Sequence, residues 1–239
     1  MYVFIGVVFA IFAVSSPCVA EPPAASSVEL IRPAGDVYNE RTSDGDSYGG
    51  TIGARATLTR GDLALSMQYW HNVYRTESAG AGSLTRYARL EGGYGTVMPF
   101  TASESSFEAR VERRLWRAVP LYAGLGGITT WTNYGYPALT GAGLGLELRP
   151  TPSSRPQFFA SAFYYPAASG SYVTESPPTR TLGATFAILK TDFGAVVHAR
   201  RSPIYVVVGF AFESRSGRNL PGDVRFIRSD PYVGIGFAR

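Results

Sequence analysis

The sequence predicts an all-β protein, an antiparallel up-and-down transmembrane β-barrel of about ten strands, within a range of about eight to twelve. Three observations lead to this fold class. Apolar and polar residues alternate with a period of two along most of the chain, the chain opens on an apolar leader, and charged residues make up only 17% of it. Such alternation is typical of strands with one apolar and one polar face. Low charge with a mean hydropathy near zero suits a barrel in lipid and excludes a bundle of membrane helices.

Residues 1–20 predict a signal peptide. The run from residue 2 to 14 is almost wholly apolar, and small residues at Cys18 and Ala20 fit cleavage after Ala20. The run is too short for a spanning helix of about 20 residues. An uncleaved membrane anchor is the alternative, because no Lys or Arg precedes the apolar run. Since Cys18 is the only cysteine, a mature chain would have neither disulfides nor a thiolate metal site.

Residues 21–50 predict a periplasmic leader that is partly disordered, because the segment is rich in Pro, Ala, Ser, Asp and Gly. Only Val28–Arg32 has a strand-like pattern, and this part can tuck into the barrel. The barrel itself is predicted over residues 51–239.

The clearest hairpin of the barrel comes first. Ile52, Ala54, Ala56 and Leu58 alternate with polar or small residues, a Gly/Asp turn follows, and Leu65 and Met67 continue the alternation on the returning strand. Ten strands are predicted in all: Thr51–Thr59, Leu63–Tyr74, Leu84–Met98, Ser106–Arg114, Leu121–Thr132, Leu139–Arg149, Gln157–Tyr165, Arg180–Ala199, Ile204–Ser214 and Pro231–Arg239.

The segment Arg180–Ala199 leaves two interpretations open. It is long enough for one strand that projects beyond the membrane, or for two strands around Lys190. Its apolar set is expected to face lipid, like the apolar sets of the other strands. The members of this set are Leu182, Ala184, Phe186 and Ile188.

The loops fall into short and long ones. Short turns of outer-membrane barrels face the periplasm and long loops face outside, which predicts that Pro166–Thr179 and Arg215–Asp230 lie outside. The rule does not fit the first strands, where the short turn Arg60–Asp62 would lie outside and Arg75–Ser83 inside.

Aromatic residues near strand ends predict two interfacial girdles, because amphipathic rings favour the boundary between membrane and water. The predicted girdle residues are Tyr69, Trp70, Tyr74, Trp131, Tyr134, Tyr164, Tyr205 and Tyr232.

The last strand, with the sequence P-Y-V-G-I-G-F over Pro231–Phe237, resembles the closing strand of the outer-membrane β-barrel superfamily, which includes adhesion-type, porin-like and lipid-modifying proteins. The segments Leu121–Gly127 and Gly141–Glu147 resemble it in the same way. The resemblance covers residues 50–239 and implies a bacterial outer-membrane location. It also implies that the insertion machinery reads a terminal aromatic residue. Here Phe237 is followed by Ala238 and Arg239, which departs from that pattern.

Catalytic and metal-binding motifs are not apparent in the sequence. Barrel enzymes that hydrolyse acyl chains need a Ser–His pair, and His71 is the weak candidate for the base. Ser66 has the opposite parity to His71, so the two should lie on opposite faces of their strand. His198 has no evident serine or acid partner. No metal and no cofactor are expected, because two distant histidines form no ligand cluster.

Charged residues on the polar faces are expected to point into the barrel lumen. The predicted set is Arg55, Arg89, Glu91, Glu108, Arg110, Glu112, Glu147 and Arg149. Either these charges pair across a mostly filled lumen, or they line a narrow aqueous path. The interior of a barrel of about eight to ten strands is largely occupied by side chains, which favours the filled lumen.

The function predicted from these features is a structural or surface-interaction barrel, monomeric and in contact with outer-membrane lipid, and enzymatic activity is disfavoured. A small solute channel and a lipid-acyl hydrolase or transferase are the alternatives. A soluble barrel that binds apolar ligands would need its apolar faces inward. Nucleic-acid binding is not expected, since the arginines are spread over many turns instead of one face.

Overall fold

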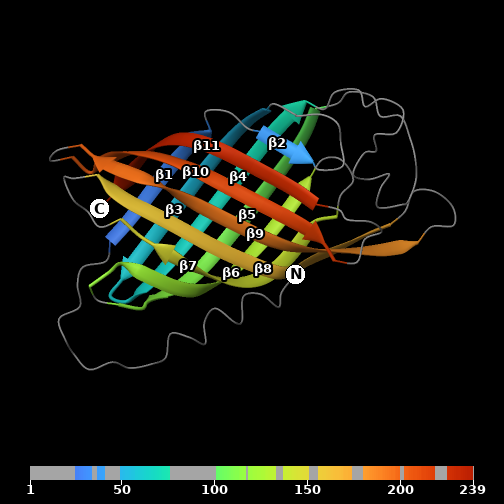
Figure 1. The fold of residues 1–239 in the computed structure, drawn as a ribbon, viewed down its shortest axis with the longest axis horizontal. Helices are drawn as coiled ribbons and strands as arrows, with labels where there is room; N and C mark the ends of the chain where they lie inside the picture. Colours follow the sequence, from blue (N-terminus) through green and yellow to red (C-terminus); the bar gives the residue numbers. More distant parts are fainter. Residues whose placement is uncertain are drawn as a thin grey trace.

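The computed structural model describes residues 25–33, 37–40, 49–75, 101–116, 118–132, 137–150, 156–173, 180–199, 202–218 and 225–238. The predicted signal peptide lies outside these residues. The described residues form β-strands joined by turns and short connections (Figure 1). The strands are β1 (Ala25–Pro33), β2 (Val37–Glu40), β3 (Gly49–Arg60), β4 (Leu63–Arg75), β5 (Thr101–Arg114), β6 (Leu121–Thr132), β7 (Leu139–Leu148), β8 (Gln157–Val173), β9 (Thr181–His198), β10 (Ile204–Gly217) and β11 (Arg225–Ala238).

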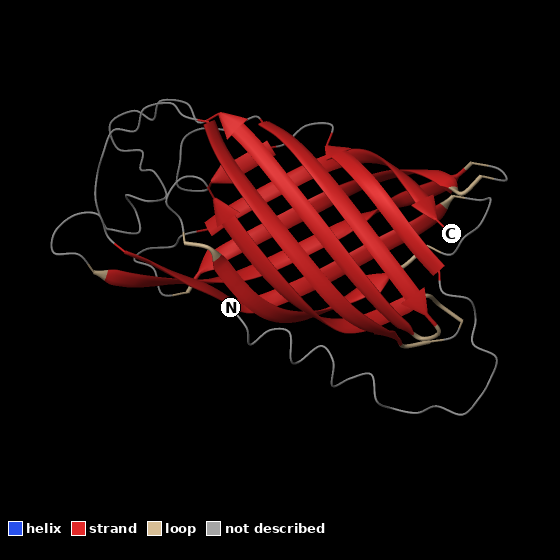
Figure 2. Cartoon of the chain, turned by 180° about the vertical axis from the view of Figure 1, so that it is seen from behind, coloured by secondary structure: helices blue, strands red, loops and turns tan. Residues whose placement is uncertain are grey.

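These strands form one closed antiparallel barrel (Figures 1 and 2). From β3 to β11 each strand pairs with the next along the chain, and β1 pairs with β3 on one side and β11 on the other. The short β2 pairs with β11 beyond β1, along the same edge. Ten strand positions therefore make up the wall, which confirms the predicted up-and-down barrel of ten strands.

The number of wall strands is as predicted, but the set of wall strands differs from the predicted one. The predicted strand Leu84–Met98 lies outside the described residues, and β4 pairs directly with β5. The tenth position belongs to β1, from the segment predicted to be a leader. The barrel thus begins at Ala25 and not at residue 51. Without β1, the edges of β3 and β11 would present unpaired backbone groups.

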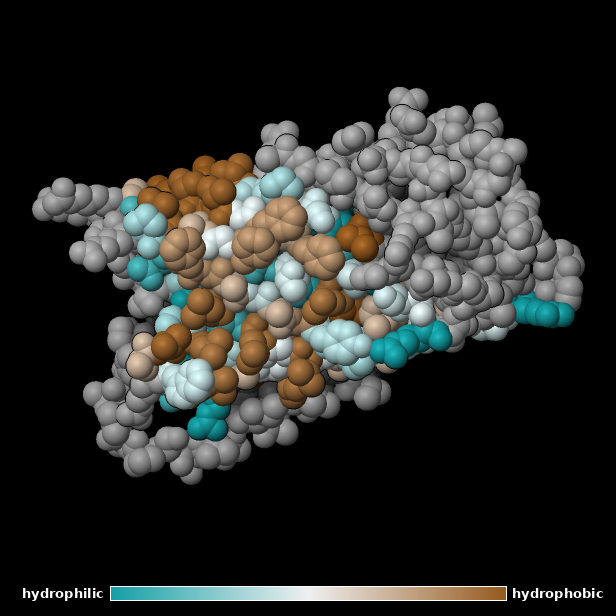
Figure 3. Space-filling view, in the orientation of Figure 1, coloured by the Kyte–Doolittle hydropathy of each residue, from teal (hydrophilic) through white to brown (hydrophobic). Residues whose placement is uncertain are grey.

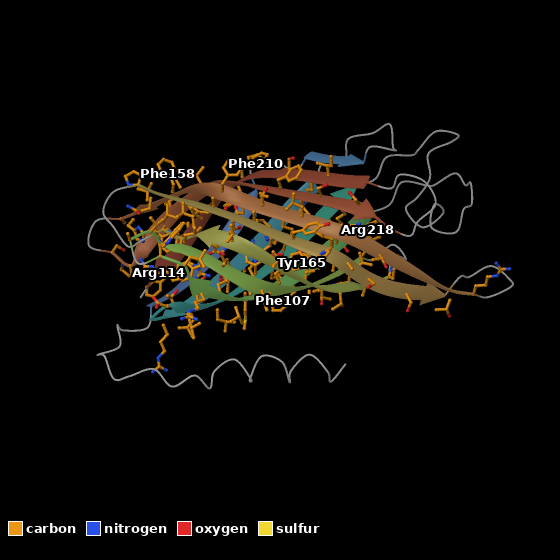
Figure 4. The ribbon with its side chains drawn as sticks, turned by 60° about the horizontal axis from the view of Figure 1, so that its bottom comes forward. Phe107, Arg114, Phe158, Tyr165, Phe210 and Arg218 are labelled. Carbon is orange, nitrogen blue, oxygen red and sulfur yellow. The ribbon has the colours of Figure 1, made fainter. Side chains whose placement is uncertain are left out.

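Counting β1 as a wall strand places the two-residue turn after β3 at the same end as the connections after β5, β7 and β9. Strands β3, β5, β7 and β9 all end there, at what is here called the turn end, and the connections that follow them are two, six, eight and five residues long. Strands β4, β6, β8 and β10 end at the opposite end, here called the loop end. In the sequence, 25 residues separate β4 from β5, and the other three connections have six or seven residues. In Figure 4, Arg114 and Phe158 mark the turn end and Arg218 marks the loop end.

The tightest connection is the two-residue turn between β3 and β4. Arg60 pairs with Leu63 across it, and Gly61 has a φ of 59°. A two-residue hairpin turn needs a positive φ at its first position, which glycine adopts without strain.

Strands β8 and β9 are longer than predicted and form a ribbon beyond their neighbours at the loop end (Figure 1). The segment predicted as Arg180–Ala199 is one strand, β9. Its pairing with β8 continues from Gly170–Ala184 to Val173–Thr181, past the last pair of β8 with β7 at Ser169. The predicted loop Pro166–Thr179 is therefore partly strand. The predicted loop Arg215–Asp230 is partly strand as well, because β10 ends at Gly217 and β11 begins at Arg225.

Candidate functional site

The two faces of the barrel wall differ as the alternation predicts, most clearly on β4. Ser66, Gln68 and Asn72 point inward and are 5–6% exposed, whereas Met67 between them is 44% exposed. On β7 the glycines and Glu147 are inward, and Leu144 and Leu146 are outward. The polar face of these strands therefore lines the lumen.

The apolar set predicted to face lipid on β9 is an exception. Phe186 and Ile188 are 1% and 0% exposed, so they point into the barrel and not toward lipid. They pack with Ile128, Phe163 and other residues in an apolar cluster on β6–β9. The parity of β9 is fixed by Lys190 and Asp192, which lie inside on the same face.

Six of the eight predicted lumen charges lie inside the barrel, and the other two, Arg89 and Glu91, lie outside the described residues. The six are Arg55, Glu108, Arg110, Glu112, Glu147 and Arg149. Six further interior charges were not predicted: Glu104, Lys190, Asp192, Glu213, Arg215 and Arg228. Their inward parity could have identified them, but the boundaries predicted for β5, β10 and β11 left out Glu104, Arg215 and Arg228.

The interior charges connect opposite walls. In a ten-position barrel β5 and β10 face each other, and Arg215 of β10 forms ion pairs with Glu104 of β5 and with Glu213. Glu108 on β5 lies 2.7 Å from Arg110 and 3.4 Å from Lys190 on β9, from carboxylate oxygen to cationic nitrogen. The same Lys190 lies 3.8 Å from Glu213. These pairs cross the lumen.

A second group of charges occupies the lumen nearer the turn end. Arg149 forms an ion pair with Glu112, and its Nε lies 3.1 Å from Glu147. Ser66 donates a hydrogen bond of 3.1 Å to Glu112 and accepts one of 2.6 Å from Arg149. Arg110, at 3.4 Å from Glu147, joins this group to Glu108, so one network extends along β5 and β7.

The interior charges balance. Among the described inward side chains in these networks, six are cationic and six are anionic. Buried charges are tolerated when they are paired and hydrogen-bonded. Each of these twelve takes part in at least one ion pair within 4 Å.

Aromatic rings on the inner face pack against glycines of the neighbouring strand. Tyr232 lies opposite Gly209 and Tyr205 opposite Gly236 across β10 and β11. Phe163 lies opposite Gly145, and Phe159 opposite Gly194. A Cβ atom added at Gly145 would come within 2.5 Å of the Phe163 ring, and one at Gly194 within 2.8 Å of Phe159. The glycines thus provide the room for rings that fill the lumen.

This packing corrects the predicted girdle. Trp70, Tyr205 and Tyr232 are 2–3% exposed and belong to an apolar cluster inside the barrel, because their parity is that of the inner face. Tyr69, Trp131 and Tyr164 do lie on the outer wall, with exposed fractions of 37–41%. The side chains of Tyr74 and Tyr134 lie outside the described residues.

One small cavity lies among the described charged side chains. A cavity lined by Gln68, Trp70, Arg110, Lys190 and Asp192, among others, has a volume of about 10 Å³. That is room for about one water molecule. Ion-paired side chains and the Trp70 ring surround it.

The outer wall from β3 to β7 is built in rows of paired residues. One row consists wholly of apolar residues: Leu58, Leu65, Val111, Leu125 and Leu144. Toward the turn end, the next row contains Arg60 and Arg113 on either side of Leu63. Toward the loop end, a later row contains His71, Ser105 and Trp131. On the outer face of these strands, no charged residue stands between these two rows.

The distance between the two boundary rows fits a membrane. Leu63 and His71 are eight residues apart on β4, which at about 3.3 Å per residue and a tilt of about 40° gives roughly 20 Å along the barrel axis. The apolar band of outer-membrane barrels is about 25 Å tall. Figure 3 shows apolar side chains across the visible barrel wall, and those of β8–β11 continue the band, including Phe158, Phe193, Val208 and Ile235.

His71 lies in the loop-end boundary row, with Asn72 on the opposite face as predicted. Its Nδ1 is 2.8 Å from the hydroxyl of Ser105 on β5, a neighbour that the sequence did not identify. Ser105 is 5% exposed and its oxygen is also 3.4 Å from the Tyr69 hydroxyl. A triad needs a third group that orients the imidazole. Among the described residues no acid or amide is seen to bond to His71, and its contact belongs to a cluster of Tyr69, His71 and Ser105.

An arginine at position 67 should distinguish the middle of the band from its edge. Met67→Arg places a cation on the outer face of β4, midway between the boundary rows, and we expect a loss of about 2–4 kcal/mol in the free energy of unfolding. Leu63→Arg is the matched control on the same strand and face, within the arginine row, with an expected loss of about 0–1 kcal/mol. Urea titration of the protein folded in lipid vesicles measures both. Equal losses would contradict a lipid-facing wall.

Two other features are absent from the described residues: a metal-binding group and a membrane-spanning helix. Within the described ranges no three His, Cys, Asp or Glu side chains gather as a metal-binding group. The described part of the chain also contains no helix with the length and hydropathy of a membrane span.

Comparison with known proteins finds solved structures of similar fold, but no match to a family model or to a curated sequence. No protein-family model matches the chain, and no curated protein matches it. Among solved structures, the chain is similar to Neisserial surface protein A, with 9% identity over 92% of this chain and 99% of that chain and a TM-score of 0.38. It is also similar to the outer membrane protease OmpT from Escherichia coli, with 10% identity over 94% and 100% and a TM-score of 0.48. A major outer membrane protein from Thermus thermophilus matches with 9% identity over 91% and 100% and a TM-score of 0.33. At this identity no residue role carries over to this chain.

Proposed function

We propose that the protein is a monomeric barrel of a bacterial outer membrane that stabilises the envelope and presents its loop end to ligands or surfaces outside the cell. Outer-membrane lipid is its immediate partner, and β11 is the segment that the insertion machinery would read. The uncharged band between the arginine row and the His71 row supports the membrane location. The turn end would face the periplasm, as short turns do in such barrels.

The observation that carries the structural role is the pairing of charges across the lumen. Arg215 joins β10 to the opposite strand β5 through Glu104, and Lys190 joins β9 to β5 through Glu108. A solute channel needs a continuous aqueous path, whereas these pairs and the rings on Gly209, Gly145 and Gly194 occupy the bore. The ribbon of β8 and β9, which ends near the exposed Arg180, supports a role in display at the loop end.

Conductance in planar bilayers tests this role. We expect the refolded protein to insert without discrete conductance steps, because the ion pairs and rings close the lumen. Slower migration of the boiled than the unboiled sample on a gel provides the control that the barrel is folded. Reproducible single-channel steps from such a folded sample would contradict the proposal and favour the channel.

A further inference from the structure

Two arginines stand in one row on the outer wall at the turn end. Arg60, the last residue of β3, pairs with Leu63 of β4, and Leu63 pairs with Arg113 of β5. Both arginines are exposed. Since neighbouring strands are about 4.8 Å apart, the two backbones are separated by about 10 Å, and two long arginine side chains can converge on one anion over Leu63.

The row lies where hydrocarbon would meet headgroups. The adjacent row toward the middle of the barrel begins with Leu58, Leu65 and Val111, all apolar. Arginine side chains lay their stems along such apolar surface and hold the charged head at the polar boundary. Trp116, which follows Arg113 in the connection after β5, is 63% exposed, as befits a tryptophan at a membrane interface.

The guanidinium groups of Arg60 and Arg113 are suited to bind a phosphate. Guanidinium groups bind phosphate oxygens through paired, charge-assisted hydrogen bonds. Among the described residues of the adjoining turn Asp62 is the acid, and one negative charge beside two arginines leaves an excess of positive charge over these three residues.

We propose that Arg60 and Arg113 form a binding site for the phosphate of an anionic glycerophospholipid in the leaflet at the turn end. This site rests on the proposed membrane location. Anionic headgroups are favoured over zwitterionic ones because the latter bring an ammonium group next to two guanidinium groups.

Native mass spectrometry tests the site. The folded protein is equilibrated in detergent with equal amounts of phosphatidylglycerol and phosphatidylcholine, and the lipid retained on the protein is counted. We expect wild type to prefer phosphatidylglycerol, and the variant Arg60→Gln/Arg113→Gln to lose about fivefold in this preference for each arginine removed. The matched control Arg180→Gln/Arg218→Gln removes two exposed arginines at the loop end and should keep the preference.

The outcomes separate this site from the barrel. An unchanged preference in the Arg60/Arg113 variant, an equal loss in the loop-end control, or no preference in wild type would overturn the site while heat-modifiable migration leaves the barrel standing. Loss of the folded band in wild type would instead overturn the proposed function. Should the double variant not fold, Arg113→Gln alone is expected to lose about fivefold, and an undiminished preference there overturns the site as well.

Discussion

Replacing Glu108 by glutamine is expected to destabilise the barrel by about 3–5 kcal/mol. The carboxylate lies between Arg110 and Lys190 and accepts a hydrogen bond of 3.1 Å from the Tyr165 hydroxyl. Glu108 is 1% exposed, so an amide there removes the nearest counter-charge of two buried cations, which keep only the longer contacts of Arg110 with Glu147 and of Lys190 with Glu213. Breaking a buried pair by removing one partner is costly for this reason. The free energy of unfolding from urea titration in vesicles measures the loss.

Two further variants identify the cause of that loss. The double variant Glu108→Gln/Lys190→Met also removes the buried ammonium group of Lys190. We expect it to be more stable than Glu108→Gln alone. Asp62→Asn changes an exposed acid in the turn after β3 and should stay within about 0.5 kcal/mol of wild type. If Glu108→Gln were as mild as Asp62→Asn, the cross-lumen pairs would not hold the walls together.

Replacing Gly209 by alanine is expected to destabilise the barrel by about 3 kcal/mol. The added Cβ would lie 2.5 Å from the Tyr232 hydroxyl oxygen and closer still to the ring. The ring cannot easily move away, because its hydroxyl donates a 2.6 Å hydrogen bond to Asp192 and its edge packs on Trp70 at 6.0 Å between centroids. Unfolding in urea, followed by tryptophan fluorescence, gives the change in free energy.

Gly183→Ala is the matched control for Gly209. It stands in another strand, where an added Cβ meets only a backbone oxygen at 4.0 Å, and it should change stability by less than about 0.5 kcal/mol. Gly209→Ala/Tyr232→Ala should lose less than the sum of its two single variants, since the overlap is removed. Additive losses would mean that the ring and the glycine do not oppose each other as described.

Prediction from sequence was most accurate where local pattern decides structure. The bounds of β6 are those predicted, and the strands β3, β4 and β7 begin or end within a few residues of their predicted ranges. Each has strict alternation and a turn residue at its end, as at Gly61. The inward position of Glu112 and Glu147 follows from that same parity.

Prediction failed where pairing between distant segments decides. Within β1, at Ala25–Pro33, only Val28–Arg32 has a local strand pattern, and its place in the wall depends on pairing with the edges of β3 and β11. The predicted strand Leu84–Met98 lies outside the described residues, and the direct pairing of β4 with β5 could not be inferred from local pattern. On β9 the apolar residues Phe186 and Ile188 were predicted to face lipid. They lie on the inner face instead, together with Lys190 and Asp192.

The sequence by itself therefore determined an antiparallel barrel with charges on one face of its strands, because a period of two is a property of each strand alone. Only the tertiary structure decided which strand closes the barrel, which aromatic rings turn inward onto glycines, and which charges meet. These outcomes depend on contacts across the lumen, such as Glu104 with Arg215. The residues in such a contact can be more than a hundred positions apart, so no local pattern records them.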